Sequence, residues 1–110
     1  MARNDLQGSL ELLILKTLSQ MGDLHGYGIV LHVHRASDEL LSVEEGSLYP
    51  ALHRMEQGGW IRSEWKLTET NRKAKYYRLT AAGQRELRKA EESFEQVVKG
   101  VCAMLRYAQG

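Results

Sequence analysis

Residues 44–61 read EEGSLYPALHRMEQGGWI and contain the only proline of the chain. Three apolar residues recur at positions i, i+4 and i+7, the spacing of one face of an α-helix: Leu48, Leu52 and Met55. The run ends at Gly58 and Gly59, and glycine is typical of the residue after a helix. The stretch predicts an amphipathic helix over about residues 44–57. Packing accounts for its apolar face but not for the polar face opposite.

The start of this helix has two interpretations. Ser42 with Glu45 three residues later matches a capping box, which places the start just after Ser42. Pro50 would then lie in the second turn, where its ring opposes the carbonyl of Gly46 and removes one hydrogen bond. The helix therefore either bends at Pro50 or begins later, near Ser47.

Length and composition limit the functions that the protein can have. A chain of 110 residues predicts one domain with a small core, which often gains stability by oligomerising. A net charge of +1 excludes a broadly basic coat, so any nucleic-acid contact must come from a local patch. The single cysteine, Cys102, excludes an intrachain disulfide. The polar start MARNDLQGS and the lack of a long apolar run predict a soluble cytoplasmic protein.

Two further helices are expected before this stretch. The first covers residues 8–22, with Ser9 as N-cap and Gly22 after its end. It is apolar on so many sides that a second chain is expected to cover one of them. The second is a short helix within residues 24–40, whose apolar stripe comprises Ile29 and Val33, with Val30 and Leu40 as further candidates.

A β-hairpin is expected after this stretch. Residues 60–67, WIRSEWKL, alternate with Ile61, Trp65 and Leu67 on one face. Residues 74–79, AKYYRL, alternate with Tyr77 and Leu79 inward. The polar residues 68–73, TETNRK, form the tip.

The last element is a long helix that opens with Thr80 as N-cap and runs to about Tyr107. Its apolar residues follow a heptad spacing, which predicts lengthwise pairing with a second helix. The expected dimer interface comprises Leu87, Ala90, Phe94, Val97, Val101 and Met104. Gly83 and Gly100 are expected to weaken this helix by about 1 kcal/mol each.

The order helix, helix, helix, hairpin, helix is that of a winged helix-turn-helix. The fold class is therefore mainly α with a small β-hairpin, and a long C-terminal dimerisation helix follows it. Residues 62–78 contain six basic and two acidic side chains, a net charge of +4 against +1 for the whole chain. Such concentrated charge on the hairpin is suited to DNA phosphates.

Three segments together resemble the PadR family of bacterial transcriptional regulators: LHGYGI (24–29), residues 44–61, and RKAKYYRLTAAG (72–83). The resemblance extends from about Leu6 to Arg88, and the short tail is similar to the compact subgroup with a single C-terminal helix. It implies a DNA-binding domain over residues 1–80 and a dimerisation helix over residues 81–110. It also implies that the third helix is the recognition helix, that the hairpin is the wing, and that the homodimer represses transcription at a palindromic operator.

The expected partners are double-stranded DNA and a second copy of the chain, with no membrane, cofactor or metal. The family includes regulators that respond to phenolic or multidrug-like compounds, so the resemblance allows a small-molecule effector. The expected DNA-binding residues comprise the outer face of the third helix and the wing tip: Ser47, Tyr49, Pro50, His53, Arg54, Arg72, Lys73 and Lys75. Pro50 is suited to a thymine methyl and Arg54 to guanine or phosphate.

Other interpretations remain open. Tyr49 could pack rather than bind, Arg54 could pair with a glutamate, and the basic tip could be only a solvated loop. The segment Gly26–Gly28 could offer backbone N–H groups to a phosphate or could simply form a turn. The sequence has no nucleophile motif and no phosphate-binding glycine loop, which argues against an enzyme. The alternative function is a winged-helix adaptor whose wing binds an acidic protein. An apolar patch on the third helix would favour the adaptor, but the side chains there are polar.

Overall fold

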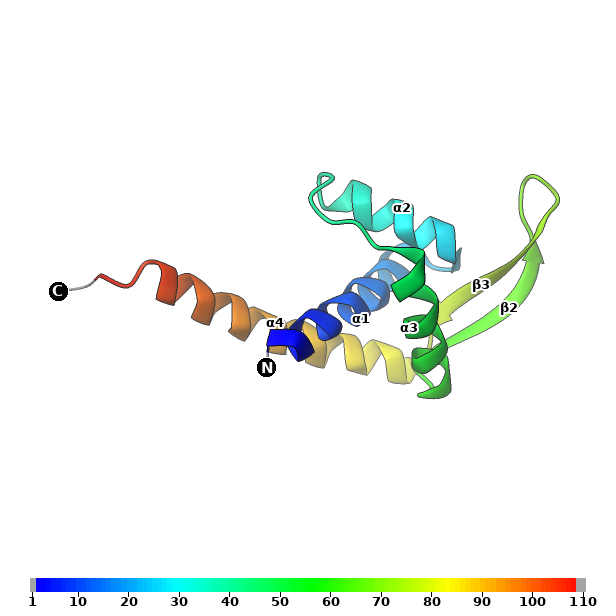
Figure 1. Ribbon diagram of the computed structural model, residues 1–110. Helices are drawn as coiled ribbons and strands as arrows, with labels where there is room; N and C mark the ends of the chain where they lie inside the picture. Colours follow the sequence, from blue (N-terminus) through cyan, green and yellow to red (C-terminus); the bar gives the residue numbers. More distant parts are fainter. Residues whose placement is uncertain (1, 109–110) are drawn as a thin grey trace.

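The computed structural model describes residues 2–108, which form four helices and one three-stranded sheet (Figure 1). The elements are α1 (Ala2–Met21), β1 (Leu24–His25), α2 (Gly26–Ala36), α3 (Glu45–Gln57), β2 (Ile61–Leu67), β3 (Lys73–Leu79) and α4 (Ala81–Leu105). This is the predicted winged-helix arrangement with a long final helix. None of the helices in the described part of the chain has the length and hydrophobicity needed to span a bilayer.

The predicted hairpin is confirmed, and it belongs to a larger sheet. Strands β2 and β3 pair antiparallel from Ile61 opposite Leu79 to Leu67 opposite Lys73. The two residues of β1 pair with the other edge of β3, giving the order β1-β3-β2. A two-residue strand lacks the alternation that predicts strands, so the sequence interpretation placed Leu24 and His25 with the second helix.

The core lies between α1, α2, α3, the sheet and the first turns of α4. The predicted inward face of α3 is confirmed, because Leu48, Leu52 and Met55 are all buried. Ile14 and Ile29 bring α1 and α2 to the same cluster, and Ile61 and Tyr77 bring the sheet to it.

The ends of α1 and α2 differ from those predicted. Helix α1 begins at Ala2 rather than after residue 8, so Ser9 lies inside it and is not its N-cap. Its predicted end is confirmed, because Gly22 follows Met21 with a φ of +78°. Helix α2 ends at Ala36, and Leu40 lies in the following loop with 84% of its surface exposed. Leu40 is therefore not part of the apolar stripe.

Helix α3 begins at Glu45, and the predicted capping box is wrong. Its N-cap is Glu44, whose side chain makes no capping bond. The carbonyl of Glu44 accepts the backbone N–H groups of Ser47 at 3.0 Å and Leu48 at 2.9 Å. Ser42 lies two residues before the N-cap, so it is not the capping residue. Pro50 lies inside the helix in its second turn.

Helix α4 begins as predicted and then leaves the body of the molecule. The Thr80 hydroxyl accepts the backbone N–H of Gly83 at 3.0 Å and so caps the helix. Leu87 is buried in the core of its own chain. Figure 1 shows that the C-terminal half of α4 projects away from the body, on the side opposite the wing. The wing is defined here as β2, β3 and the loop 68–72.

The face of the wing on which alternation places Ile61, Trp65 and Leu67 is buried at one end only. Ile61 and Tyr77 do pack inward, but Trp65 and Leu67 on the same face are 64% and 61% exposed. Alternation fixes the face on which a strand residue lies, but not whether another element covers that part of the strand.

Candidate nucleic-acid interface

The outer face of α3 presents the five residues predicted to read DNA. Ser47, Tyr49, Pro50, His53 and Arg54 are all exposed. The buried residues of α3 hold the opposite side of the helix against the core. A helix held in this way can present its outer side chains to a groove about 12 Å wide, the width of the DNA major groove.

Tyr49 both packs and faces solvent. Its ring lies against α2, where a Cβ built on Gly26 would lie 2.5 Å from the Tyr49 hydroxyl oxygen. Gly26 therefore leaves the space that this ring occupies. With 45% of its surface exposed, Tyr49 also remains accessible to a ligand.

Arg54 has an acidic neighbour within its own chain. The nearest approach is 3.8 Å, between Nη2 of Arg54 and Oε2 of Glu11 on α1. The Arg54 side chain is 55% exposed, and an exposed pair at this distance contributes little to stability. The guanidinium group can therefore exchange this contact for a phosphate or a base.

The tip of the wing carries free positive charge. Within residues 9–108, the side chains of Arg72 and Lys73 form no ion pair, and both residues are exposed. The loop between them and β2 is ordered by Thr68, whose backbone N–H donates to the Arg72 carbonyl at 2.7 Å. Asn71 provides the left-handed residue of this turn, with φ of +66°.

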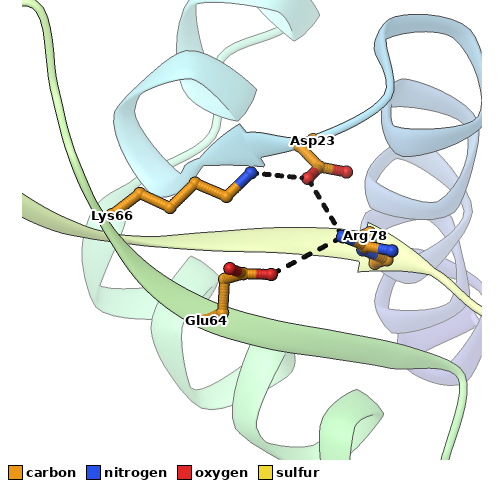
Figure 2. A network of polar contacts seen from close by, with 4 residues as sticks. All are labelled: Asp23, Glu64, Lys66 and Arg78. Carbon is orange, nitrogen blue, oxygen red and sulfur yellow. Dashed lines mark hydrogen bonds and ion pairs between the residues drawn. The ribbon is translucent and has the colours of Figure 1, made fainter.

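Two basic residues on one face of the wing are paired with carboxylates (Figure 2). Lys66 donates a 2.9 Å hydrogen bond to Asp23, and Arg78 lies 3.6 Å from Asp23 and 3.5 Å from Glu64. The hydrogen bond from Lys66 lowers the pKa of Asp23, and the same bond raises the pKa of Lys66. Within residues 9–108, Arg62 at the base of β2 makes no ion pair, so unpaired positive charge remains there as well as at the tip. Sequence reasoning missed Asp23, because it lies in the turn between α1 and β1, outside any periodic pattern.

Glu56 connects α3 to the wing. Its Oε2 accepts a 2.6 Å hydrogen bond from the Ser63 hydroxyl, and its Oε1 lies 3.9 Å from Nζ of Lys75. Lys75 is thus the one predicted wing residue with an acidic neighbour. Burial raises the pKa of Tyr77 on this same face, and the charge of Glu56 adds to that effect.

The N-terminus of α2 is capped by a histidine that the sequence did not indicate. The backbone N–H of Gly28 donates to Nδ1 of His25 at 3.0 Å. The His25 ring also packs edge-on against Tyr76, with ring centroids 5.2 Å apart. This bond occupies the Gly28 N–H, one of the groups considered for phosphate binding.

The seam predicted for dimerisation is exposed along the outer part of α4. Ala90 is half-buried, and four further seam residues are exposed: Phe94, Val97, Val101 and Met104. Leu87 is not available to a partner, since it lies in the core of its own chain. A groove of about 380 Å³ runs between α1 and α4 and is lined by Leu12, Leu15, Trp60, Ala90, Phe94 and Val97, among others.

The described residues include no group of three or more histidine, cysteine, aspartate or glutamate side chains that could hold a metal ion. Cys102 is half-buried on α4 with a free thiol.

The sequence and the fold both match known proteins. Residues 14–89 match the family described as "Transcriptional regulator PadR-like family". A transcriptional regulator from Clostridium thermocellum is 31% identical, with a TM-score of 0.82 over 92% of this chain and 97% of that one. A PadR-like transcriptional regulator from Bacillus cereus is also 31% identical, with a TM-score of 0.76 over 94% and 97% of the two chains. An uncharacterised protein from Lysinibacillus sphaericus is 26% identical over 98 residues, 88% of this chain and 89% of that protein.

Proposed function

The chain belongs to the PadR-like family of transcriptional regulators, and from this premise we propose that it binds specific operator sequences in duplex DNA as a homodimer and represses transcription. Its family and its structural neighbours are regulators rather than enzymes. One observation carries the proposal: the exposed polar face of α3 and the unpaired charges of Arg72 and Lys73 lie on elements that Glu56 and Ser63 hold together.

In this proposal α3 enters the major groove and reads base edges. Arg54 donates to guanine or to a phosphate, and Pro50 offers an apolar surface without an N–H group to a thymine methyl. Ser47 and His53 supply further polar contacts. Tyr49 approaches a phosphate at the edge of the groove. Its ring occupies the space that Gly26 leaves by lacking a side chain.

The wing tip supplies phosphate contacts that carry no sequence information. Arg72 and Lys73 bind the DNA backbone directly. Lys75 exchanges its contact with Glu56, which is 3.9 Å long and exposed, for a phosphate. These contacts give affinity and set the orientation of α3 on the duplex.

We propose that residues 1–80 bind DNA and that residues 81–110 form the homodimer, with the contact along α4 (Ala81–Leu105). Phe94, Val97, Val101 and Met104 are apolar yet exposed in the protomer, so a second α4 would remove them from water. A two-fold dimer presents two copies of α3, which need half-sites ~34 Å apart and hence a palindromic operator. A second chain over the groove between α1 and α4 would also create a site for a small-molecule effector. A regulator of this kind acts in the bacterial cytoplasm.

Selection of genomic fragments by the purified protein, followed by sequencing and footprinting, tests this proposal. The expected result is a recurrent motif with two-fold symmetry, protected on both half-sites. Recovery of fragments without a common motif would contradict sequence-specific binding, and protection of one asymmetric half-site would contradict the dimer. Failure to retain any duplex at low salt would instead favour the adaptor function.

A further inference from the structure

The two faces of the wing have different chemistry. The register places Trp65 opposite Lys75 and Leu67 opposite Lys73, and directly paired residues of antiparallel strands lie on the same face. This face continues toward the tip from Ser63 and the buried Tyr77, which lie opposite each other. It is named here the apolar wing face and comprises Trp65, Leu67, Lys73 and Lys75.

The apolar wing face is not covered by its own chain. Tyr77, at the base of the same face, is only 6% exposed, whereas Trp65 and Leu67 are 64% and 61% exposed. Figure 1 shows the outer part of the wing projecting away from the helices. Single exposed apolar residues are ordinary on protein surfaces. A tryptophan and a leucine side by side on a strand, each opposite a lysine, form instead a small apolar patch with positive charge along one edge.

The charged residues on the two faces of the wing indicate what kind of ligand the apolar wing face binds. On the opposite face, Lys66 and Arg78 are paired with Asp23 and Glu64 (Figure 2), and the basic residue without an ion pair within residues 9–108 is Arg62, at the base of β2 and away from the tip. On the apolar wing face, Lys73 makes no ion pair within residues 9–108, and Lys75 has only the 3.9 Å contact with Glu56. The face therefore fits a surface that is anionic along its edge and apolar between the charges. Duplex DNA has this form in its minor groove, where deoxyribose and base edges lie between two rows of phosphates.

We infer that Trp65 and Leu67 bind DNA as an apolar contact to the deoxyribose wall of the minor groove, while Lys73 and Lys75 hold the phosphates beside it. This inference rests on the proposed DNA-binding function and adds an apolar contact to a wing otherwise expected to act through charge alone. Trp65, with a large apolar ring and one N–H donor, is suited to an interface that is partly wet.

Tryptophan fluorescence tests the contact directly, since the chain has two tryptophans. Trp60 directly precedes β2 and lines the groove between α1 and α4, at the end of the wing opposite the tip. Adding a random-sequence duplex of about 30 base pairs, roughly three helical turns, should change the emission of Trp60→Phe, which retains Trp65, in a saturable way. The emission of Trp65→Phe, which retains only Trp60, should change much less.

Affinity measurements at several salt concentrations provide the second test. Trp65→Ala should weaken binding of that duplex about tenfold, because it leaves most of the apolar contact unmade. Its salt dependence should stay that of the wild type, since no charge is lost. Lys73→Ala should instead lower the slope of log K against log salt by about one. Leu40→Ala, which removes an exposed leucine far from the wing in sequence, is the matched control and should bind normally.

The outcomes separate the inference from the function on which it rests. If the wild type binds the duplex while Trp65→Ala binds equally well and the Trp65 emission stays constant, the inference is wrong and the function stands. If Trp65→Ala changes the sedimentation coefficient of the free protein, a second copy of the chain covers this face and the inference is also wrong. If the wild type binds no duplex at low salt, both fail together.

Discussion

The hydroxyl of Ser63 donates a 2.6 Å hydrogen bond to Oε2 of Glu56 and thereby joins the wing to α3. The two elements that would contact DNA are thus fixed to each other by a charge-assisted bond as well as by the core. Because this bond lies only partly buried, it can hold the angle between α3 and the wing while leaving their outer faces accessible.

Replacing Ser63 with alanine should lower the free energy of unfolding by about 1–2 kcal/mol, since a hydrogen bond to a charged acceptor is lost. Chemical denaturation measures this change. Ser42→Ala is the matched control, because Ser42 is exposed in the loop before α3 and caps no helix. Equal stabilities of the two variants would show that the bond contributes nothing.

The two glycines of α4 should respond oppositely to alanine. At Gly83 a Cβ would lie 2.1 Å from the Trp60 carbonyl oxygen, whereas at Gly100 it would meet nothing within 4 Å. Gly83→Ala should therefore cost roughly 2 kcal/mol or more, since backbone must move. Gly100→Ala should stabilise α4 by up to about 1 kcal/mol, through helix propensity alone. Thermal unfolding of the two variants distinguishes the sites, and a stabilised Gly83→Ala would contradict this packing.

Gly83 illustrates what sequence reasoning could and could not supply. Helix propensity treats Gly83 as equivalent to Gly100, because a preference averaged over helices contains no information on the Trp60 carbonyl, 23 residues away in the chain. The inward face of α3, the hairpin and the Thr80 cap were predictable, because each depends on local periodicity or on a side chain bonding a nearby backbone group.

The features that were missed depend on contacts between distant residues. Strand β1 exists because Leu24 and His25 pair with Tyr77 and Tyr76, and no pattern within two residues indicates this. Leu87 fits the heptad pattern but packs on its own core, since the same apolar residue suits either partner. Alternation likewise placed Trp65 on the correct face of the strand, but it could not indicate that no other element covers this part of the face.

The stabilising effect of Asp23 should depend on pH. The hydrogen bond from Lys66 holds its pKa below the ordinary value of 3.8, and the charge of Arg78 acts in the same direction. A lowered carboxyl pKa stabilises the fold above that ordinary value, and the effect is lost as the pH falls through the lower folded pKa.

Asp23→Asn should therefore be less stable than the wild type at neutral pH, and the difference should shrink as the pH falls below 3.8 and disappear once the pH is below the lowered pKa of the folded state. Since the Asp23 side chain is 34% exposed, the neutral-pH difference should be less than about 1 kcal/mol. Denaturation at a series of pH values measures it, with the exposed Glu69→Gln as control. A difference that persists unchanged at low pH would exclude the ion pair as its cause.

Replacing Phe94 with aspartate should dissociate the proposed dimer, because a charge buried in the seam costs several kcal/mol. The free protomer should stay folded, since Phe94 is 40% exposed there. Sedimentation should give about 12.5 kDa for the variant and twice that for the wild type. Lys99→Asp, on the side of α4 away from the seam, should remain dimeric. A wild type that sediments as a monomer at micromolar concentration would contradict the dimer.

The most direct test of DNA reading by α3 is the affinity of Arg54→Ala for the selected operator and for random duplex, measured beside Lys73→Ala. Arg54→Ala should lose about 1–3 kcal/mol on the operator and much less on random DNA, because a base contact is lost. Lys73→Ala should weaken both duplexes alike, because a phosphate contact carries no sequence information. Equal losses on both duplexes for Arg54→Ala would make Arg54 a phosphate contact, and unchanged binding by both variants would contradict DNA binding through α3 and the wing.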